Sequence, residues 1–115
     1  MTRLLVLGAG SGGYATALRA AQLGLSVALI ERDKLGGTCL HRGCIPTKAL
    51  LHAAEVADSV RESQKFGIRA QLESIDMSGV NAYKDKVIAR LYKGLQGMVR
   101  SRDITFVEGE GCLVG

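Results

Sequence analysis

Apolar runs bounded by glycines mark the start of the chain. The run Arg3–Gly10 (RLLVLGAG) ends in glycine, which predicts a buried parallel strand followed by a tight turn. From Gly12 the apolar residues recur at helical spacing until Gly24, a suitable C′ residue for a helix. Ser26–Glu31 (SVALIE) is a second apolar run. The order strand, helix, strand within about 30 residues predicts a βαβ unit.

The rest of the pattern predicts two more helices and a third strand. The alanine-rich segment Lys48–Ser63 has the composition of a helix, and the short segment Phe66–Ala70 is interpreted as a loop. A long helix is expected from about Met77 to Val99, with an apolar stripe along one face. The stripe consists of Val80, Val87, Ile88, Leu91, Leu95 and Met98. Ile104–Gly109 is rich in β-branched and aromatic residues, which favours a strand. The predicted fold class is α/β, a Rossmann-like βαβ fold with a parallel sheet.

Composition narrows the class of protein. With 47% hydrophobic and 23% charged residues over 115 positions, the chain reads as one modest globular domain. The net charge is only +4, and the basic residues between 84 and 102 are interpreted as a solvated helix face, so no nucleic-acid partner is expected. Apolar runs are too short for a membrane span, and glycines interrupt the N-terminal one, which disfavours a signal peptide. We therefore expect a cytoplasmic protein without a membrane partner.

A glycine motif follows the first predicted strand. Gly8, Gly10 and Gly13 match G-x-G-x-x-G, with Ser11 and Gly12 between them. The first glycine permits a tight turn, the second a close approach of the backbone to a pyrophosphate, and the third close packing of helix on strand. Free N–H groups at the helix start then face the negative charge.

Glu31 ends the second predicted strand, 23 residues after Gly8. A carboxylate at this place can accept hydrogen bonds from an adenosine ribose. Motif and carboxylate together predict a site for adenosine diphosphate, which FAD and NAD share. The alternative is a glycine-rich turn beside a surface carboxylate.

Two of the three cysteines, Cys39 and Cys44, lie in the segment GGTCLHRGCIPTK. Their spacing is wider than in a zinc ribbon and a second cysteine pair is lacking, so no metal site is expected. Two inert buried cysteines remain an alternative. A disulfide would need a break in the helix, because residues five apart in a regular helix have Cα atoms about 8.6 Å apart. Bridged cysteines need less than about 7 Å.

The residues around the pair supply such a break. Pro46 cannot donate to the carbonyl of Arg42, so a helix is predicted to begin near Pro46 with Cys44 just ahead of it. The helix dipole there stabilises a thiolate, and Arg42 and Lys48 add positive charge. A lowered thiol pKa suits thiol–disulfide exchange. The glycines that loosen the backbone are Gly36, Gly37 and Gly43.

Together, GGTCLHRGCIPTKALLH and VLGAGSGGYATALRAAQLG resemble the flavin disulfide reductases, and within that family most closely the dihydrolipoamide dehydrogenase branch. Glutathione, mycothiol and mercuric reductases of the same family stay open as alternatives, as does a nucleotide-binding fragment without turnover. Members are several times longer than this chain. The resemblance thus implies that residues 1–115 are the N-terminal part of an FAD-binding domain, inactive alone, with NAD and dimerisation domains elsewhere.

The resemblance also implies roles for single residues. Cys39 would be the interchange thiol that meets the substrate, Cys44 the charge-transfer thiol against the flavin, and Lys48 a neighbour of the flavin N5 edge. Further FAD contacts would come from Glu31, Arg32, Gly37, Thr38 and Gly111.

The implied partners are dihydrolipoamide or a lipoyl domain, NAD as co-substrate, and a second copy of the chain. His41 and Arg42 stand where the family commonly has Asn and Val. Because the family's catalytic base comes from a distant C-terminal segment, His41 is expected to be a solvated side chain.

Overall fold

A parallel sheet of three strands lies at one end of the molecule, in a computed structural model that describes residues 2–115. The strands are β1 (Leu4–Leu7), β2 (Val27–Glu31) and β3 (Thr105–Glu108), side by side in that order. Leu4 is opposite Val27 in the first pair, and Glu31 is opposite Glu108 in the second. The α/β class and the parallel sheet predicted from the sequence are confirmed.

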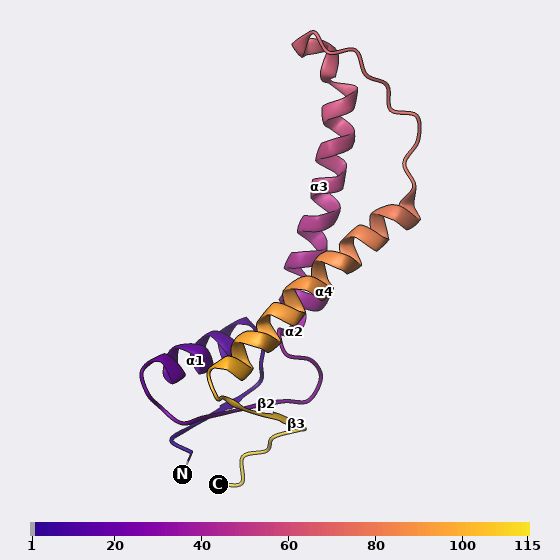
Figure 1. Cartoon of the computed structure of the whole chain (residues 1–115). Coiled ribbons are helices and arrows are strands. Elements are labelled where there is room, and N and C mark those ends of the chain that lie inside the picture. The colour runs from indigo at the N-terminus through magenta and orange to yellow at the C-terminus, as the bar shows by residue number, and fades with distance from the viewer. Residues whose placement is uncertain (1) are drawn as a thin grey trace.

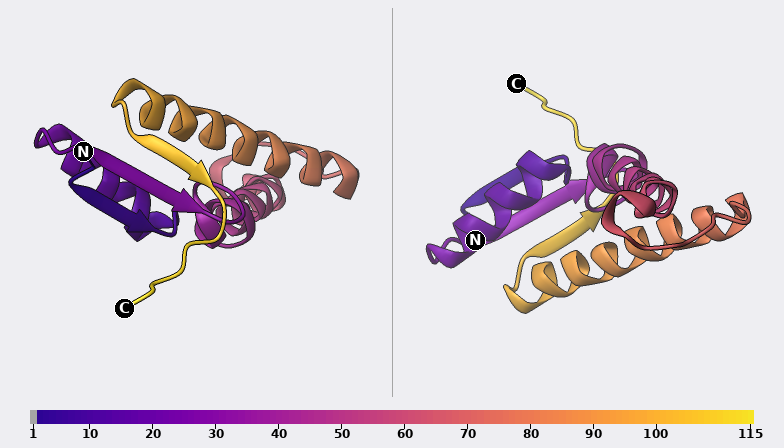
Figure 2. Two further views of the ribbon diagram at one scale, coloured as in Figure 1. Left: turned by 90° about the horizontal axis from the view of Figure 1, so that it is seen from below. Right: turned by 90° about the horizontal axis from the view of Figure 1, so that it is seen from above.

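Two helices cover one face of this sheet (Figures 1 and 2). They are α1 (Ser11–Gln22), which connects β1 to β2, and α4 (Met77–Ser101), which leads into β3. Both crossovers step in the same direction across a parallel sheet, and right-handed connections then place both helices on one side. Helix α1 ends as predicted, with Gly24 at φ +83° after the cap residue Leu23.

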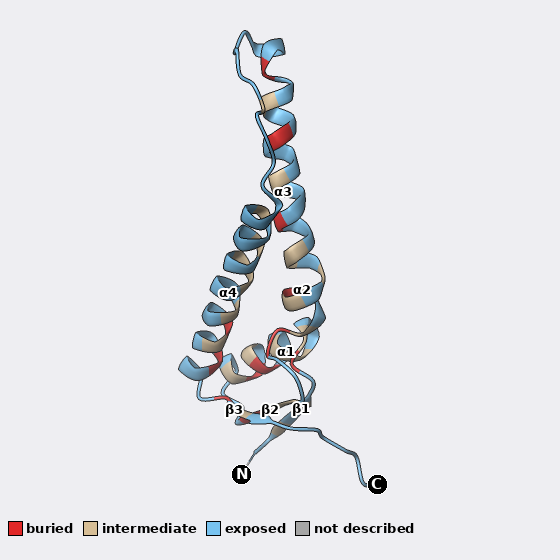
Figure 3. Cartoon of the chain, turned by 90° about the vertical axis from the view of Figure 1, so that its right-hand side faces the viewer, coloured by how far each residue is buried: buried red, intermediate tan, exposed pale blue. Residues whose placement is uncertain are grey.

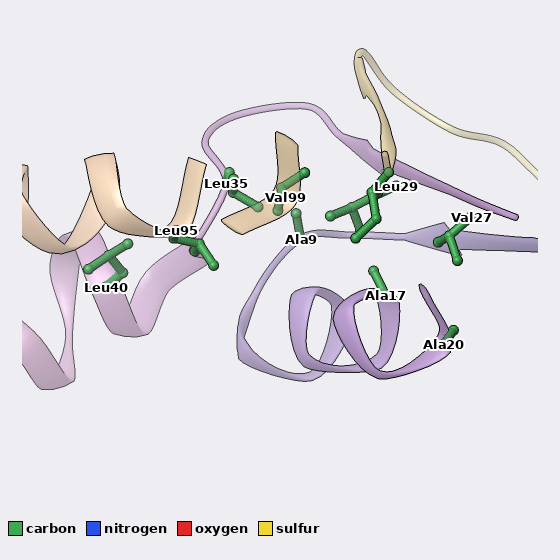
Figure 4. Close-up of a cluster of buried hydrophobic side chains, with 10 residues drawn as sticks. Ala9, Ala17, Ala20, Val27, Leu29, Leu35, Leu40, Leu95 and Val99 are labelled. Atoms are coloured by element: carbon green, nitrogen blue, oxygen red, sulfur yellow. The ribbon is translucent and has the colours of Figure 1, made fainter. Parts of the chain in front are cut away.

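The core lies between these helices and the sheet (Figure 4). Leu29 in the middle of β2 is completely buried. Ala17 and Ala20 face it from α1, and Leu95 and Val99 belong to the same cluster from α4. The small alanine side chains let α1 approach the sheet closely. The loop between β1 and α1 must therefore make a tight turn.

The opposite face of the sheet is largely open. Leu5, Leu7 and Val107 are 56%, 43% and 42% exposed there, although strands of parallel sheets are usually buried on both faces. Among residues 2–115, β1 pairs with β2 alone, so its outer edge is unpaired. The segment after β3 returns to this face, and Gly111 lies against the side chain of Leu7.

A helical hairpin projects from the sheet and gives the molecule its elongated shape, 64 × 26 × 21 Å (Figures 1 and 3). It consists of α2 (Gly37–Arg42), α3 (Cys44–Arg61), the short 3-10 turn η1 (Ser63–Phe66) and α4. The connection between η1 and α4 is irregular, in line with the loop predicted at Phe66–Ala70. Within residues 2–115, no helix is long and apolar enough to cross a membrane.

The first strand does end where the tight turn was predicted, at Leu7, because Gly8 at φ +89° turns the chain away from the sheet. Several other predicted boundaries were wrong. Helix α3 begins at Cys44 rather than near Pro46 or Lys48, and α2 was not predicted at all. Helix α4 extends two residues beyond Val99, to Ser101.

Candidate functional site

The glycine loop joins the end of β1 to the start of α1. Gly8 donates its N–H to the carbonyl of Ile30 at 2.8 Å and takes a positive φ that favours glycine. A Cβ atom on Gly13 would overlap the carbonyl oxygen of Gly8, which is a backbone atom that cannot swing aside. The first turn of α1 therefore packs directly on the loop, as the close packing predicted for Gly13 requires.

The same loop touches the cysteine segment. A Cβ atom on Gly37 would lie only 2.7 Å from the Cα of Gly10. Gly36 and Gly37 both have positive φ, and the N–H of Gly36 donates to the carbonyl of Ala9 at 2.8 Å. These contacts bring the glycine loop and the start of α2 together, although they lie far apart in sequence.

Glu31 turns back toward the glycine loop from the carboxyl end of β2. Its carboxylate accepts the N–H of Ala9 at 2.7 Å and the N–H of Asp33 at 2.9 Å. The hydrogen bond from Ala9, followed by that from Asp33, lowers the pKa of Glu31 below its ordinary value. The carboxylate is therefore ionised at neutral pH.

Two cavities flank Glu31, and Glu31 and Arg32 line both. One lies beside Gly10 and the start of α2, where Gly37 and Thr38 also line it. The other lies at the carboxyl edge of the sheet, and its lining includes Gly8 and Gly111. A larger, mainly apolar cavity between the outer parts of α3 and α4 contains no predicted site residue.

The structure joins Cys39 and Cys44 by a disulfide, with their Cα atoms 4.7 Å apart. Cys39 lies on α2 and Cys44 is the first residue of α3. Gly43 separates the two helices with φ −127° and ψ −108°, values outside the helical region. The helix break that a disulfide was predicted to need is therefore present, and it falls at one of the three glycines named for it.

The expected position of Cys44 ahead of a helix beginning near Pro46 was wrong. Pro46 is the third residue of α3, where its missing N–H would have no partner inside the helix in any case. Cys44 is exposed and Cys39 is half-buried, while Lys48 is exposed one turn further along α3. The predicted residues that line neither cavity beside Glu31 are Ser11, Gly12, Gly13, Cys39, Cys44 and Lys48.

His41 is not the solvated side chain that was expected. Its Nε2 lies 2.9 Å from the carbonyl oxygen of Leu35, and its ring packs edge-on against Tyr92 of α4, with centroids 4.8 Å apart. The ring is half-buried and lines the cavity beside Gly10. The exposed neighbour Arg42 pairs with Asp33 at 3.2 Å.

The sequence carried no local signal for the contact between His41 and Tyr92, because Tyr92 belongs to a distant helix. The part of the chain that the structure describes contains no group of three or more histidine, cysteine or acidic residues arranged to hold a metal ion.

Comparison of the sequence with known proteins identifies a family and several relatives that it matches. The family model described as pyridine nucleotide-disulphide oxidoreductase matches residues 2–115. The chain is 46% identical over 108 residues to dihydrolipoyl dehydrogenase 2 of Haloarcula marismortui, covering 94% of this chain and 23% of that protein.

Two further relatives agree with this match. Dihydrolipoyl dehydrogenase of Chlamydia trachomatis is 48% identical over 110 residues (96% of this chain, 24% of the relative). That of Bacillus subtilis is 44% identical over 112 residues (97% and 24%). The chain thus spans about a quarter of the length of the curated relatives it matches. Because the family model matches residues 2–115, nearly the whole of the given sequence, this chain belongs to the pyridine nucleotide-disulphide oxidoreductase family.

Proposed function

We propose that the full-length protein is an FAD-dependent dihydrolipoamide dehydrogenase that oxidises dihydrolipoamide with NAD⁺ through the Cys39–Cys44 disulfide. The observation that carries this proposal is the disulfide that bridges the helix break at Gly43. One of its cysteines lies on α2, and the first residue of α2, Gly37, contacts Gly10 of the glycine loop. A redox-active bond is thereby held beside a site suited to a dinucleotide. The names of the similar proteins support the choice of dihydrolipoamide as substrate.

The residues of the glycine loop fit an adenosine diphosphate group. Gly13 allows α1 to start directly against the loop, so its first N–H groups are available to a pyrophosphate. Glu31 is ionised and stands between two cavities, where ribose hydroxyls can donate to it. The residues we assign to FAD are Gly8, Gly10, Ser11, Gly12, Gly13, Glu31, Arg32, Gly37, Thr38, Cys44, Lys48 and Gly111.

The two cysteines would take the electrons of the substrate by exchange. One substrate thiolate attacks the sulfur of Cys39, forming a mixed disulfide and breaking the bond to Cys44, which leaves as a thiolate. The second substrate thiol loses its proton and attacks its own partner sulfur, which closes the lipoamide disulfide and releases Cys39 as a thiolate that takes up a proton. When bound, FAD supplies the acceptor for the two electrons then held by the dithiol, and NAD⁺ is the final acceptor.

Cys44 is the better leaving group of the pair. It is the first residue of the 18-residue helix α3, whose N-terminal dipole favours a thiolate. Lys48 follows one turn later on the same helix and adds positive charge. Cys39 lies on a six-residue helix and lacks this advantage. We therefore assign interchange with the substrate to Cys39 and the stabilised thiolate to Cys44.

The assignment extends to partners and location. We propose a lipoyl domain as the carrier of the substrate, a second copy of the chain as the partner in a homodimer, and the cytoplasm as the compartment. A reducing compartment suits a disulfide that is opened and closed in each cycle. The resemblance to the family supports these three points.

Turnover by the full-length protein tests the proposal. We expect NAD⁺ reduction that depends on dihydrolipoamide, and loss of that activity in both Cys39→Ser and Cys44→Ser. Cys112→Ser is the matched control, because Cys112 is an exposed free thiol outside the pair. Faster turnover with glutathione disulfide, mycothiol disulfide or mercuric ion than with lipoamide would assign the protein to another branch of the family.

A further inference from the structure

Helix α2, which carries Cys39, is too short to be stable alone. It has six residues, and isolated helices of that length do not persist in water. In the oxidised protein the bond to Cys44 adds a second covalent link to α3 beside the backbone at Gly43 and so fixes the orientation of α2. Once that bond is reduced, the backbone still joins α2 to α3 through Gly43, but noncovalent contacts alone can hold α2 in the orientation that points Cys39 at its partner.

Two side chains of α2 make such contacts. Leu40 is buried in the core cluster, next to the backbone of Gly36. His41 lies 2.9 Å from the Leu35 carbonyl oxygen through Nε2 and packs its ring edge-on against Tyr92. His41 thus connects α2 both to the segment that follows β2 and to α4.

The hydrogen bond to Leu35 determines which nitrogen of the His41 ring carries the proton. A carbonyl oxygen can only accept, so Nε2 must carry the proton in the neutral ring. A charged ring keeps the same donor, and the contact therefore survives protonation. The neighbouring ion pair between Arg42 and Asp33 is exposed on both sides and contributes little by comparison.

We propose that His41 is a positioning residue that holds α2 in place while the disulfide is open, so that Cys39 and Cys44 can rejoin. This inference rests on the proposed exchange at the two cysteines. The hydrogen bond from His41 to Leu35 and the disulfide both require α2 in the same position. Formation of either one therefore favours formation of the other. Loss of the donor then leaves the reduced form less ordered, and the disulfide forms less readily.

The reduction equilibrium of the full-length protein measures this effect. The protein is equilibrated in dithiothreitol buffers of graded ratio, the free thiols are alkylated, and the open pair is counted by mass spectrometry. His41→Phe keeps a ring for Tyr92 but removes the donor. We expect the equilibrium constant for forming the disulfide to fall by up to about five-fold, the equivalent of one ordinary hydrogen bond. That corresponds to a reduction potential about 20 mV higher.

Two further variants give the experiment its specificity. His41→Gln places an amide donor near the position of Nε2, and we expect it to restore most of the wild-type equilibrium. His52→Phe makes the same exchange at the exposed histidine that pairs with Glu55, and we expect no change. An unchanged equilibrium in His41→Phe overturns the inference, and so does an equal fall in His41→Gln. Absence of dihydrolipoamide turnover in wild type, with this pattern intact, overturns the proposed function alone.

Discussion

Gly12 and Gly13 are adjacent residues in the first turn of α1, and substitution by alanine has opposite consequences at the two positions. On Gly13 the new methyl group would overlap the carbonyl oxygen of Gly8 and lie 2.9 Å from its carbonyl carbon. On Gly12 nothing lies within 4 Å of the new methyl group. The pair therefore separates the packing of helix on loop from the intrinsic preference of alanine for a helix.

The expected change in the stability of α1 follows from helix propensity and from the packing clash. Alanine in place of glycine favours a helix by up to about 1 kcal/mol, and Gly12→Ala receives this gain without a clash. Overpacking costs about 1–3 kcal/mol, and Gly13→Ala should lie at the upper end because backbone atoms must move. We expect a net loss of about 2 kcal/mol for Gly13→Ala. The two variants then differ by about 3 kcal/mol, more than a hundred-fold in an opening equilibrium.

Hydrogen exchange of the α1 amides in the full-length, FAD-free protein reads this difference locally. Protection of α1 should fall in Gly13→Ala and rise or stay constant in Gly12→Ala. Equal protection in the two variants would refute the argument that α1 is pressed against the carbonyl of Gly8. FAD retention should fall in Gly13→Ala as well, since a shifted helix start withdraws its N–H groups.

Three other perturbations have directions fixed by the structure. The pKa of Glu31 is lowered in the folded state, so its contribution to stability is present above the unfolded pKa and is lost as pH falls through the folded value. Glu31→Gln should therefore flatten the acid limb of a pH–stability profile, and an unchanged acid limb would argue against the hydrogen bond from Ala9. Reduction of the disulfide, which closes a short loop, should lower stability by about 2 kcal/mol, measured by urea unfolding with and without reductant. Asp76 caps α4 by accepting the N–H of Ser78, so Asp76→Ala should speed amide exchange in the first turn of α4 and Asp76→Asn should do so less.

The sequence predicted those features of the fold that depend on neighbouring residues, such as the end of α1 and the turn before it. Gly24 ended α1 because a left-handed residue closes a helix, and the spacing of Gly8, Gly10 and Gly13 marked a strand-to-helix turn. The tight turn was assigned to Gly8, the first glycine of the motif, and Gly8 takes the positive φ.

The missed features depend on distant contacts. Helix α2 has only six residues and is held by contacts of Leu40, His41 and Cys39 with other parts of the chain, so a propensity argument did not reveal it. The role of His41 depends on Tyr92, which the fold alone brings near. The carboxylate of Glu31 was predicted to face a ribose, but its bond to the backbone of the glycine loop required knowledge of how closely β2 and the loop approach.

The break at Gly43 turns the number of residues between the cysteines into a geometric constraint. Cys39 is carried by one helix and Cys44 starts the next, so the bridge depends on the rotation of α2 about its own axis. Deleting or adding one residue in that helix would turn the Cys39 side chain by about 100°. Side chains at positions 41 and 42 point elsewhere, to Leu35 and Asp33. The length of this segment is therefore fixed by the sulfur chemistry, whereas position 42, whose exposed side chain pairs with Asp33, is free to vary without breaking the bridge.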